Sequence, residues 1–385
     1  MEHLAVADID LNALAHNVAE LRRLSSDARM MAVVKADGYG HGAVPVARTA
    51  LAGGADHLAV ARLSEAVAMR TAGIDAPILL LGHSPAATTK TLIEMQITAA
   101  VNEDQAAHDL SAAAHRLGKK LSVHLKIDTG MGRLGWVACT GPAAHGDTPA
   151  QRVRKVAESI LNIGRLPGLA IEGLFTHFAN ADSSDKEHAR LQFSIFMDLL
   201  DELERHGFSV GLRHAANSAA TIDMPETHLD MVRPGIALYG LWPSAEVNRN
   251  RINLHPVMTF KSRVIGLKSV PAGFPISYGS TYRTSGSTRI ATIALGYADG
   301  LNRLLSSKGN ILIGGRRCPI IGRVCMDLVM VDVSHVPEVA VEDEAVAIGE
   351  QKGQHITAEE VAEQVGTINY EIATSITQRV KRIYK

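Results

Sequence analysis

The stretch Ala-Val-Val-Lys-Ala-Asp-Gly-Tyr-Gly-His-Gly, residues 32 to 42, joins an apolar run to a loop with three alternating glycines. Residues 30–34 are large, apolar or β-branched and show no polar alternation, which predicts a short strand buried on both faces. The next residue is Lys35. An amine at a dry strand end loses hydration, so its pKa falls toward the range in which lysine acts as a nucleophile or base. The alternative is a solvated lysine whose charge reaches water.

This apolar run is the first of eight that alternate, up to residue 236, with segments of helical apolar spacing. The alternation is typical of parallel strands covered by helices. Eight units fit a (β/α)₈ TIM-type barrel better than an open doubly wound sheet, although one misread short run would reopen that choice. The predicted strands are Met30–Val34, His57–Val60, Pro77–Leu81, Ile97–Val101, Leu121–Ile127, Leu169–Phe175, Val210–Ala215 and Asp230–Arg233.

Local signals also indicate where several of the covering helices begin. A capping residue before a proline, or three residues before a Glu or Gln, marks a helix start, and regular apolar spacing marks the face that packs inward. The signals are Ser84-Pro85, Asn102 with Gln105, Thr148-Pro149, and the apolar residues at four-residue intervals in 185–206.

After Gly240 the sequence changes character and predicts a second, mainly β domain. Short runs rich in Val, Ile and Thr are separated by Gly or Pro, and a single helix, Ala358–Val365, follows Thr357. The predicted division is 1–244 for the barrel and 245–385 for the mainly β C-terminal domain. The predicted strands are Val257–Val270, Thr288–Leu295, Asn310–Ile313, Cys318–Ile321, Leu328–Val333, Glu344–Ile348 and Gln378–Tyr384.

Composition limits the kinds of partner. A net charge of −1 and a pI near 7.0 argue against a nucleic-acid or anionic-membrane footprint. The start, Met1-Glu2-His3-Leu4, lacks a basic and apolar leader, and no run reaches the roughly 18 apolar residues of a membrane span. Three cysteines form neither a metal spacing nor an even disulfide set. We expect a cytoplasmic protein without a metal site, whose partners are small molecules or a second copy.

Polar residues gather where barrel strands are predicted to end, which is where barrel enzymes carry their active sites. Ser218 and the backbone N–H groups near Gly235 and Ile236 would form a neutral phosphate cradle. A lysine on one side, this cradle opposite and Arg233 between them is the layout of a pyridoxal phosphate site. The candidates are Lys35, Lys126, Arg133, His177, His214, Asn217, Ser218, Arg233, Gly235 and Ile236.

Each candidate also has a structural alternative. His177 is compatible with a hydrogen-bonded core histidine, Arg233 with a surface ion pair, and Ser218 with the cap of a short helix at 219–223. The same arrangement would also serve a phosphosugar isomerase or a Schiff-base aldolase. The pattern of residues alone therefore predicts a phosphate-binding barrel with a candidate lysine.

Nine motifs, in order along the chain, resemble those of the bacterial alanine racemases, pyridoxal-phosphate enzymes of fold type III. The match runs almost from end to end. The motifs are Val34-Lys35-Ala-Asp-Gly-Tyr-Gly-His-Gly, Lys126-Ile-Asp-Thr-Gly-Met-Gly-Arg133-Leu-Gly, Thr176-His-Phe-Ala, His214-Ala-Ala-Asn-Ser-Ala-Ala, Arg233-Pro-Gly-Ile, Ser277-Tyr-Gly-Ser-Thr-Tyr, Gly296-Tyr-Ala-Asp-Gly, Gly322-Arg-Val-Cys-Met-Asp and Asn369-Tyr-Glu-Ile.

The resemblance implies interconversion of L- and D-alanine by two bases, which supplies D-alanine for cell-wall peptidoglycan. Lys35 carries the cofactor as an imine and acts on one face of the substrate, while Tyr278 acts on the other. His177 and Arg133 are implied to lower the pKa of that tyrosine. Because the family takes it from the neighbouring subunit, the resemblance also implies a homodimer with shared active sites.

Further roles are implied by the same match. Arg233 faces the pyridine nitrogen and can only donate a hydrogen bond, so the ring stays neutral, and His214 supports it. Lys126 matches a position carbamylated in many members, where an anion orients Arg133 toward the substrate carboxylate. The alternative there is an unmodified lysine. The residues implied around the phosphate are Tyr39, Asn217, Ser218, Gly235, Ile236 and Tyr370, and those on the substrate side are Met326 and Tyr297, with Asp327 as a supporting neighbour.

The departures from the family pattern are small, at Gly38, Asn302 and Lys381, and they bear on loop rigidity and not on the chemistry. Three other functions remain as alternatives: a broad-specificity amino-acid racemase, a cofactor-homeostasis protein with a similar barrel, and a fold type III decarboxylase. Homeostasis proteins lack a second domain with a Ser-Tyr-Gly motif, and decarboxylases place a carboxylate where Arg233 stands. Broad specificity stays open, because one methylene changes binding by only about 1 to 3 kcal/mol.

Overall fold

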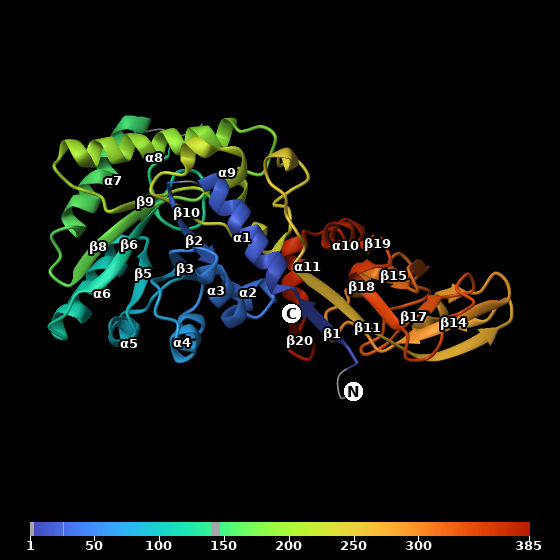
Figure 1. Cartoon of the computed structure of the whole chain (residues 1–385). Helices are drawn as coiled ribbons and strands as arrows, with labels where there is room; N and C mark the ends of the chain where they lie inside the picture. Colours follow the sequence, from blue (N-terminus) through green and yellow to red (C-terminus); the bar gives the residue numbers. More distant parts are fainter. Residues whose placement is uncertain (1–3, 26, 140–146) are drawn as a thin grey trace.

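A computed structural model describes residues 4–25, 27–139 and 147–385. A helix-covered barrel formed by the N-terminal part lies beside a β-rich C-terminal domain (Figure 1). Met1 to His3, to which the expectation about a leader refers, lie outside the described residues. Across the described ranges, no helix combines the length and the apolar character that crossing a membrane requires.

The barrel contains all eight strands that the sequence predicts. In sheet order they run β10-β2-β3-β4-β5-β6-β8-β9, and every pair along this path is parallel. The first and last strands of the path form no ladder, but Asp230 N–H donates to the Arg213 carbonyl over 3.1 Å, so the barrel is nearly closed. The strands are β2 (Arg29–Val33), β3 (His57–Val60), β4 (Ile78–Leu80), β5 (Ile97–Val101), β6 (Leu121–Asp128), β8 (Leu169–Phe175), β9 (Leu212–His214) and β10 (Met231–Val232).

Helices cover the outside of this sheet. Thr148 caps its helix through a capping box with Gln151, as predicted, and the predicted helix at 185–206 is present. A two-residue strand, β7 (Trp136–Val137), pairs with β6 outside the main path. The helices are α1 (Leu11–Ser25), α3 (Ala43–Ala52), α4 (Leu63–Thr71), α5 (Thr89–Glu94), α6 (Asp104–Arg116), α7 (Pro149–Ile163), α8 (Glu187–Arg205) and α9 (Ser218–Asp223), while α2 (Lys35–Tyr39) is a left-handed turn.

Two of the predicted caps are wrong. A 3₁₀ turn, η1 (Ala86–Thr88), follows Pro85, and the buried hydroxyl of Ser84 has no hydrogen-bond partner. Helix α6 is preceded by Glu103 rather than Asn102, and no side chain caps it. The first residue of each helix depends on where the preceding strand ends. Local sequence composition does not fix that helix start to a single residue.

The C-terminal domain is built on a second, nine-stranded sheet. Its main path is β16-β15-β18-β11-β1-β20, with β14, β17 and β19 attached. Helix α10 (Ala358–Val365) is capped by Thr357 as predicted, whereas α11 (Asn369–Ser375) was not predicted. The strands are β11 (Met258–Val270), β14 (Thr288–Ile293), β15 (Asn310–Ile313), β16 (Arg316–Pro319), β17 (Val329–Asp332), β18 (Glu344–Gln351), β19 (Gln354–Ile356) and β20 (Lys381–Tyr384), with the small pair β12 (Pro275–Ile276) and β13 (Tyr282–Arg283) beside them.

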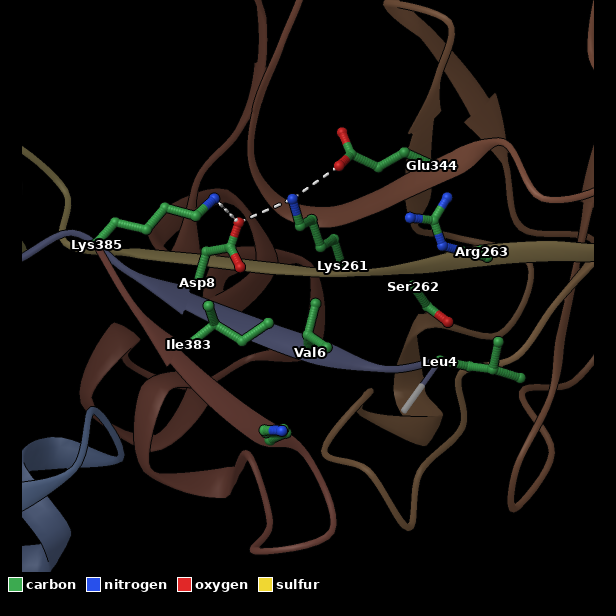
Figure 2. A pocket seen from close by; sticks show the side chains of 10 residues that line it. Leu4, Val6, Asp8, Lys261, Ser262, Arg263, Glu344, Ile383 and Lys385 are labelled. Atoms are coloured by element: carbon green, nitrogen blue, oxygen red, sulfur yellow. Dashed lines mark hydrogen bonds and ion pairs between the residues drawn. The ribbon is translucent and has the colours of Figure 1, made fainter. Parts of the chain in front are cut away.

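Strand β1 (Val6–Ile9) belongs to this second sheet and not to the barrel. It pairs antiparallel with β11 and parallel with β20. Figure 2 shows the charged cluster beside it, where Lys261 Nζ lies 2.8 Å from both Asp8 Oδ2 and Glu344 Oε2, and Lys385 also bonds to Asp8. The first strand of the chain therefore extends the C-terminal domain, while the division at residue 244 stays a prediction.

Candidate active site

The loop after β2, here called the lysine loop (residues 35–42), holds Lys35 at the start of a left-handed turn. Ala36, Asp37 and Gly38 have φ values of 53°, 52° and 60°. A left-handed residue with a Cβ costs about 1–2 kcal/mol, so this conformation persists only where neighbours support it. Asp37 Oδ1 accepts the N–H of Ala43 over 2.8 Å, and Glu65 Oε1 accepts that of Ala36 over 2.6 Å. The supported turn therefore fixes the backbone conformation from which the Lys35 side chain extends.

Lys35 itself is half-buried, and its pKa is lowered. Burial is the main cause, the positive charge of Arg133 adds to it, and Glu65 opposes it. A larger fraction of neutral amine is therefore present than for a solvated lysine. This environment favours the chemical interpretation of Lys35 over the solvated one.

Arg133 is placed by a loop that one carboxylate organises. Asp128, at the end of β6, accepts through Oδ1 the N–H groups of Gly130 (2.9 Å), Met131 (2.8 Å) and Gly132 (3.2 Å), and through Oδ2 that of Arg133 (3.1 Å). The sequence analysis assigned no role to this residue, although an aspartate followed by glycines is a known turn signal.

Lys126 is buried on β6. Its pKa is lowered to about 8, first by burial and then by the charges of Arg133 and Arg233. Its Nζ lies 5.9 Å from the centre of the Phe175 ring. Loss of the charge at moderate pH suits an amine that can react as a nucleophile.

Arg233 is buried, which rules out the surface ion pair. Its guanidinium donates to the carbonyls of Thr176 (2.8 Å) and Ala215 (3.0 Å) and to Nδ1 of His214 (3.0 Å), and Nη2 lies 3.3 Å from Nδ1 of His177. Burial lowers the pKa of Arg233 to about 9. Because a guanidinium has no acceptor, both histidines present an unprotonated Nδ1 to it.

These histidines are neutral at pH 7. Burial, followed by the charge of Arg233, lowers the pKa of both His177 and His214 well below the ordinary value. Beyond His214 lies a residue that the sequence analysis missed, since Nδ1 of His124 is 2.8 Å from Nε2 of His214. Its only signal was an inward position on a predicted strand.

Ser218 does not cap helix α9, which corrects the structural alternative. Asn217 is the cap and accepts the N–H of Ala220 over 3.0 Å. The Ser218 hydroxyl is thereby free to accept the N–H of Gly235 over 2.8 Å, across the ends of two barrel strands. Ile236 opens the 3₁₀ helix η3 (Ile236–Tyr239), so its buried N–H has no intrahelical acceptor.

The Tyr39 hydroxyl group occupies the space that a side chain at position 235 would need. A Cβ at this position would lie 2.6 Å from the Tyr39 hydroxyl oxygen. The Tyr39 ring stacks on the ring of Tyr239, with 4.8 Å between the two ring centroids, and its centroid lies 6.2 Å from that of the Tyr370 ring. Burial raises the pKa of both Tyr39 and Tyr370, so both hydroxyls remain protonated donors. Together with Ser218 they provide neutral donors around one small space.

Tyr278, Tyr297 and Met326 lie on the C-terminal domain, and their exposed fractions are 71%, 41% and 52%. Two contacts hold their segments near one another: Tyr297 N–H donates to the Cys325 carbonyl (3.0 Å), and the Ser277 hydroxyl contacts the side chain of Cys325 at Sγ (3.4 Å). Within the described residues, no hydrogen bond, ion pair or ring contact joins these three side chains to the lysine loop.

Ionisable groups collected at the carboxyl ends of parallel barrel strands define an enzyme of the barrel class. No group of three or more His, Cys, Asp or Glu side chains suited to a metal ion occurs in residues 4–25, 27–139 and 147–385. The kind of barrel enzyme follows from the relatives of the chain.

Family models described as the alanine racemase N-terminal and C-terminal domains match residues 9–243 and 257–384. An alanine racemase of Desulfosudis oleivorans is 55% identical over 99% of this chain and 96% of its own, and one of Desulforamulus reducens is 49% identical over 98% of each. The chain belongs to the alanine racemase family.

Solved structures agree with this assignment. An alanine racemase of Clostridium difficile 630 superposes with a TM-score of 0.91 at 37% identity, covering 100% of this chain and 96% of that one. An alanine racemase of Bacillus anthracis, solved with bound L-Ala-P, gives a TM-score of 0.89 at 38% identity with the same coverage. The predicted fold class, a (β/α)₈ barrel followed by a mainly β domain, is confirmed.

Proposed function

We propose that this protein is a cytoplasmic, pyridoxal-phosphate-dependent racemase that interconverts L- and D-alanine and so supplies D-alanine for peptidoglycan. The observation that carries the proposal is the position of Lys35. It is half-buried, its pKa is lowered, and it follows the first strand of the barrel that also carries Arg233 and the Ser218–Gly235 contact. Family membership supplies the reaction.

The residues of the barrel end fit the cofactor in charge and hydrogen bonding. Ser218, Gly235, Ile236, Tyr39 and Tyr370 would hold the phosphate, with the Asn217 cap keeping Ser218 in place. The first-turn N–H of Ile236 and the neutral hydroxyls suit an anion. Gly235 also lacks the Cβ that would displace the Tyr39 hydroxyl. Pyridoxal phosphate, when bound, supplies an electron-withdrawing ring that makes the substrate Cα proton acidic.

Arg233 would lie against the ring nitrogen of the cofactor. A guanidinium donates a hydrogen bond without giving up its proton, so that nitrogen would remain unprotonated. The carbonyls of Thr176 and Ala215 and the imidazole of His214 hold Arg233 in place. This arrangement argues against the decarboxylase alternative, which needs a carboxylate at the same position.

Two bases must act from opposite faces of Cα, because inversion requires a proton to leave from one side and return to the other. Lys35 Nζ serves one face and the Tyr278 hydroxyl the other. Arg133 binds the substrate carboxylate. Lys126 carries a carbamate that orients Arg133, which its pKa of about 8 supports, because only a neutral amine adds to CO₂.

The second base would come from a partner subunit in a homodimer. Tyr278 is 71% exposed and follows Ser277, whose φ of 62° belongs to a strained turn that directs the next residue outward. Tyr297 and Met326 extend the exposed surface toward the substrate. A cofactor-homeostasis protein would have no use for such a surface, whereas a shared active site requires one.

The test uses the purified holoenzyme. Borohydride reduction followed by peptide mass spectrometry should find the cofactor mass on the peptide that contains Lys35. L-Alanine should lose optical rotation, and L-serine and L-lysine should do so far more slowly. Comparable rates on all three would mean a broad-specificity racemase, and a colourless protein that takes up no cofactor would overturn the proposal.

A further inference from the structure

Two glycines of the lysine loop are needed because the C-terminal domain lies directly against the loop backbone. Gly40 and Gly42 have φ values of 82° and 93°, in the left-handed region that favours glycine. A Cβ at Gly40 would overlap the carbonyl oxygen of Ala373 in α11. A Cβ at Gly42 would overlap the hydroxyl oxygen of Tyr384 in β20. Helix α11 and strand β20 therefore pack on the backbone of the loop that carries Lys35 (Figure 1).

Strand β20 also sends one side chain to this loop. The guanidinium of Arg382 donates through Nε to the carbonyl oxygen of Gly40 over 3.0 Å. Its remaining nitrogens donate to carbonyls of the segment between α11 and β20, here called the C-terminal turn (residues 376–380). These carbonyls belong to Ile376 (2.7 Å), Thr377 (2.5 Å) and Val380 (2.8 Å). One half-buried side chain thus joins the C-terminal turn to the lysine loop.

The chemistry of arginine explains why one side chain can make all four contacts. A guanidinium presents five N–H donors in a rigid planar fork, whereas a lysine ammonium carries three donors on a single atom. Burial lowers the pKa of Arg382, and the negative charge of Asp37, in the lysine loop, opposes that effect. The guanidinium remains charged at working pH, so its bonds to the carbonyls are charge-assisted and stronger than bonds between neutral groups.

The anchored loop carries two residues of the candidate active site. Lys35 opens the loop, and Tyr39 directly precedes Gly40, whose carbonyl Arg382 binds. A left-handed run of residues persists only where its surroundings support it. Glu65 supports the beginning of the loop from the barrel side, through the N–H of Ala36. Arg382 supports the other end from the C-terminal domain.

We propose that Arg382 is a positioning residue that holds the lysine loop against the C-terminal domain and so keeps Lys35 and Tyr39 in place for the reaction. The catalytic consequence rests on the proposed racemase function, whereas the anchoring of the loop does not. Arg133, which would bind the substrate carboxylate, lies on a different loop that Asp128 organises. Loss of Arg382 therefore affects the turnover step more than the binding of alanine.

Hydrogen exchange measured by mass spectrometry tests the anchoring without using activity. The amides of Gly38, Gly40, His41 and Gly42 donate to carbonyls within residues 34–38, so their exchange reports opening of the lysine loop. With pyridoxal phosphate in excess, Arg382→Met should make peptides from residues 35–42 exchange roughly tenfold faster, because a charge-assisted bond is lost. Faster exchange confined to the C-terminal turn would overturn the proposal, since Arg382 would then support only its own segment.

Lys381→Met is the matched control, because it removes a positive charge from an exposed position of the same strand. It should leave exchange of the lysine loop unchanged. An equal increase in Lys381→Met and Arg382→Met would contradict the proposal, because any loss of charge from β20 would then have the same effect.

Steady-state kinetics of the holoenzyme test the catalytic consequence. Arg382→Met should lower kcat for alanine roughly ten- to hundredfold, because the base is misplaced, and leave KM within about twofold. Arg382→Lys keeps the charge but cannot reach all four carbonyls, so it should restore only part of kcat. A rise in KM with unchanged kcat, or full recovery in Arg382→Lys, would overturn the positioning role.

Arg382→Lys also carries both measurements if Arg382→Met fails to fold, with lysine-loop exchange expected between the wild-type and fully loosened values. The two experiments separate this proposal from the proposed function. A wild-type protein that does not racemise alanine would overturn the racemase function and the catalytic part of the positioning role. Faster exchange of the lysine loop in the variants would support the anchoring in either case.

Discussion

The guanidinium of Arg233 donates a hydrogen bond to Nδ1 of His214 across 3.0 Å. This bond sets the donor-to-acceptor direction of a chain of hydrogen bonds that continues beyond His214. Since Nδ1 of His214 accepts, its hydrogen is on Nε2, which lies 2.8 Å from Nδ1 of His124 and donates to it. A buried cation is thus stabilised by two neutral rings with defined tautomers. Phe175 stacks on His214 at 4.9 Å and fixes the ring plane.

Buried neutral histidines make stability depend on pH. The folded pKa is lowered for His41, to about 4, and for His124, to about 3, and it is also lowered for His177 and His214. Unfolded histidine titrates near 6.5, so the unfolded chain binds more protons below that pH. The stabilisation is complete above about pH 6.5 and is lost as pH falls toward the folded values, by up to about 1.4 kcal/mol per pH unit for each ring.

Urea unfolding at several pH values between 7 and 4.5 measures this slope. His124→Gln should reduce the slope of unfolding free energy against pH by an amount that corresponds to roughly one proton. The exposed His83→Gln serves as the control and should leave the slope unchanged. An identical slope in both variants would show that the buried histidines do not change their protonation when the protein unfolds.

Gly235→Ala should destabilise the holoenzyme and weaken cofactor binding. The new Cβ would lie 2.6 Å from the Tyr39 hydroxyl, and overpacking of this kind costs about 1–3 kcal/mol. Tyr39→Phe removes that oxygen, so the double variant should regain part of the lost stability. Thermal unfolding and cofactor titration of all four proteins give the coupling energy, and simple additivity would contradict the predicted clash.

Asp128→Asn should raise KM for alanine more than it lowers kcat. The carboxylate holds four consecutive N–H groups, and an amide cannot accept at both ends, so the loop that positions Arg133 loosens. A loss of about 1–3 kcal/mol in transition-state binding is expected. Steady-state kinetics measure it. The exposed Asp27→Asn is the control, and a fall in kcat alone would contradict a positioning role.

A mixture of Lys35→Ala and Tyr278→Phe chains distinguishes a shared site from one contained in a single chain. If each site combines residues of two subunits, a mixed dimer has one intact site. Random pairing of equal amounts should therefore restore about a quarter of the wild-type activity. Each variant alone sets the baseline. Absence of recovery, with mixed dimers verified by mass spectrometry, would place both bases in the same chain.

Carbamylation of Lys126 should be visible by ¹³C NMR in bicarbonate-enriched buffer. A pKa of about 8 leaves much more neutral amine near pH 7.5 than an ordinary lysine has. Lys126→Arg should lose the carbamate signal and raise KM for alanine roughly tenfold, because Arg133 loses its anionic neighbour. A wild-type spectrum without the signal would favour an unmodified lysine.

Much of the fold follows from local patterns. The eight barrel strands appear within a residue or two of their predicted positions, because an apolar run bounded by helical spacing is a signal contained in about ten residues. Strand β1 was not predicted, because a run of four residues shows little periodicity. Its partner strands, β11 and β20, also lie hundreds of positions away along the chain. Helix α11 was missed for the same lack of length.

The sequence by itself determined the alternation of strands and helices, the second β-rich domain and the motifs that resemble alanine racemases, because periodicity and residue type are properties of neighbours along the chain. Only the tertiary structure decided that Asn217 caps α9 and leaves Ser218 to Gly235, that Arg233 is buried against His214, and that Arg382 binds the carbonyl of Gly40 from the second domain. Those facts depend on which groups meet across long separations and are shielded from water, and the order of residues alone does not specify either.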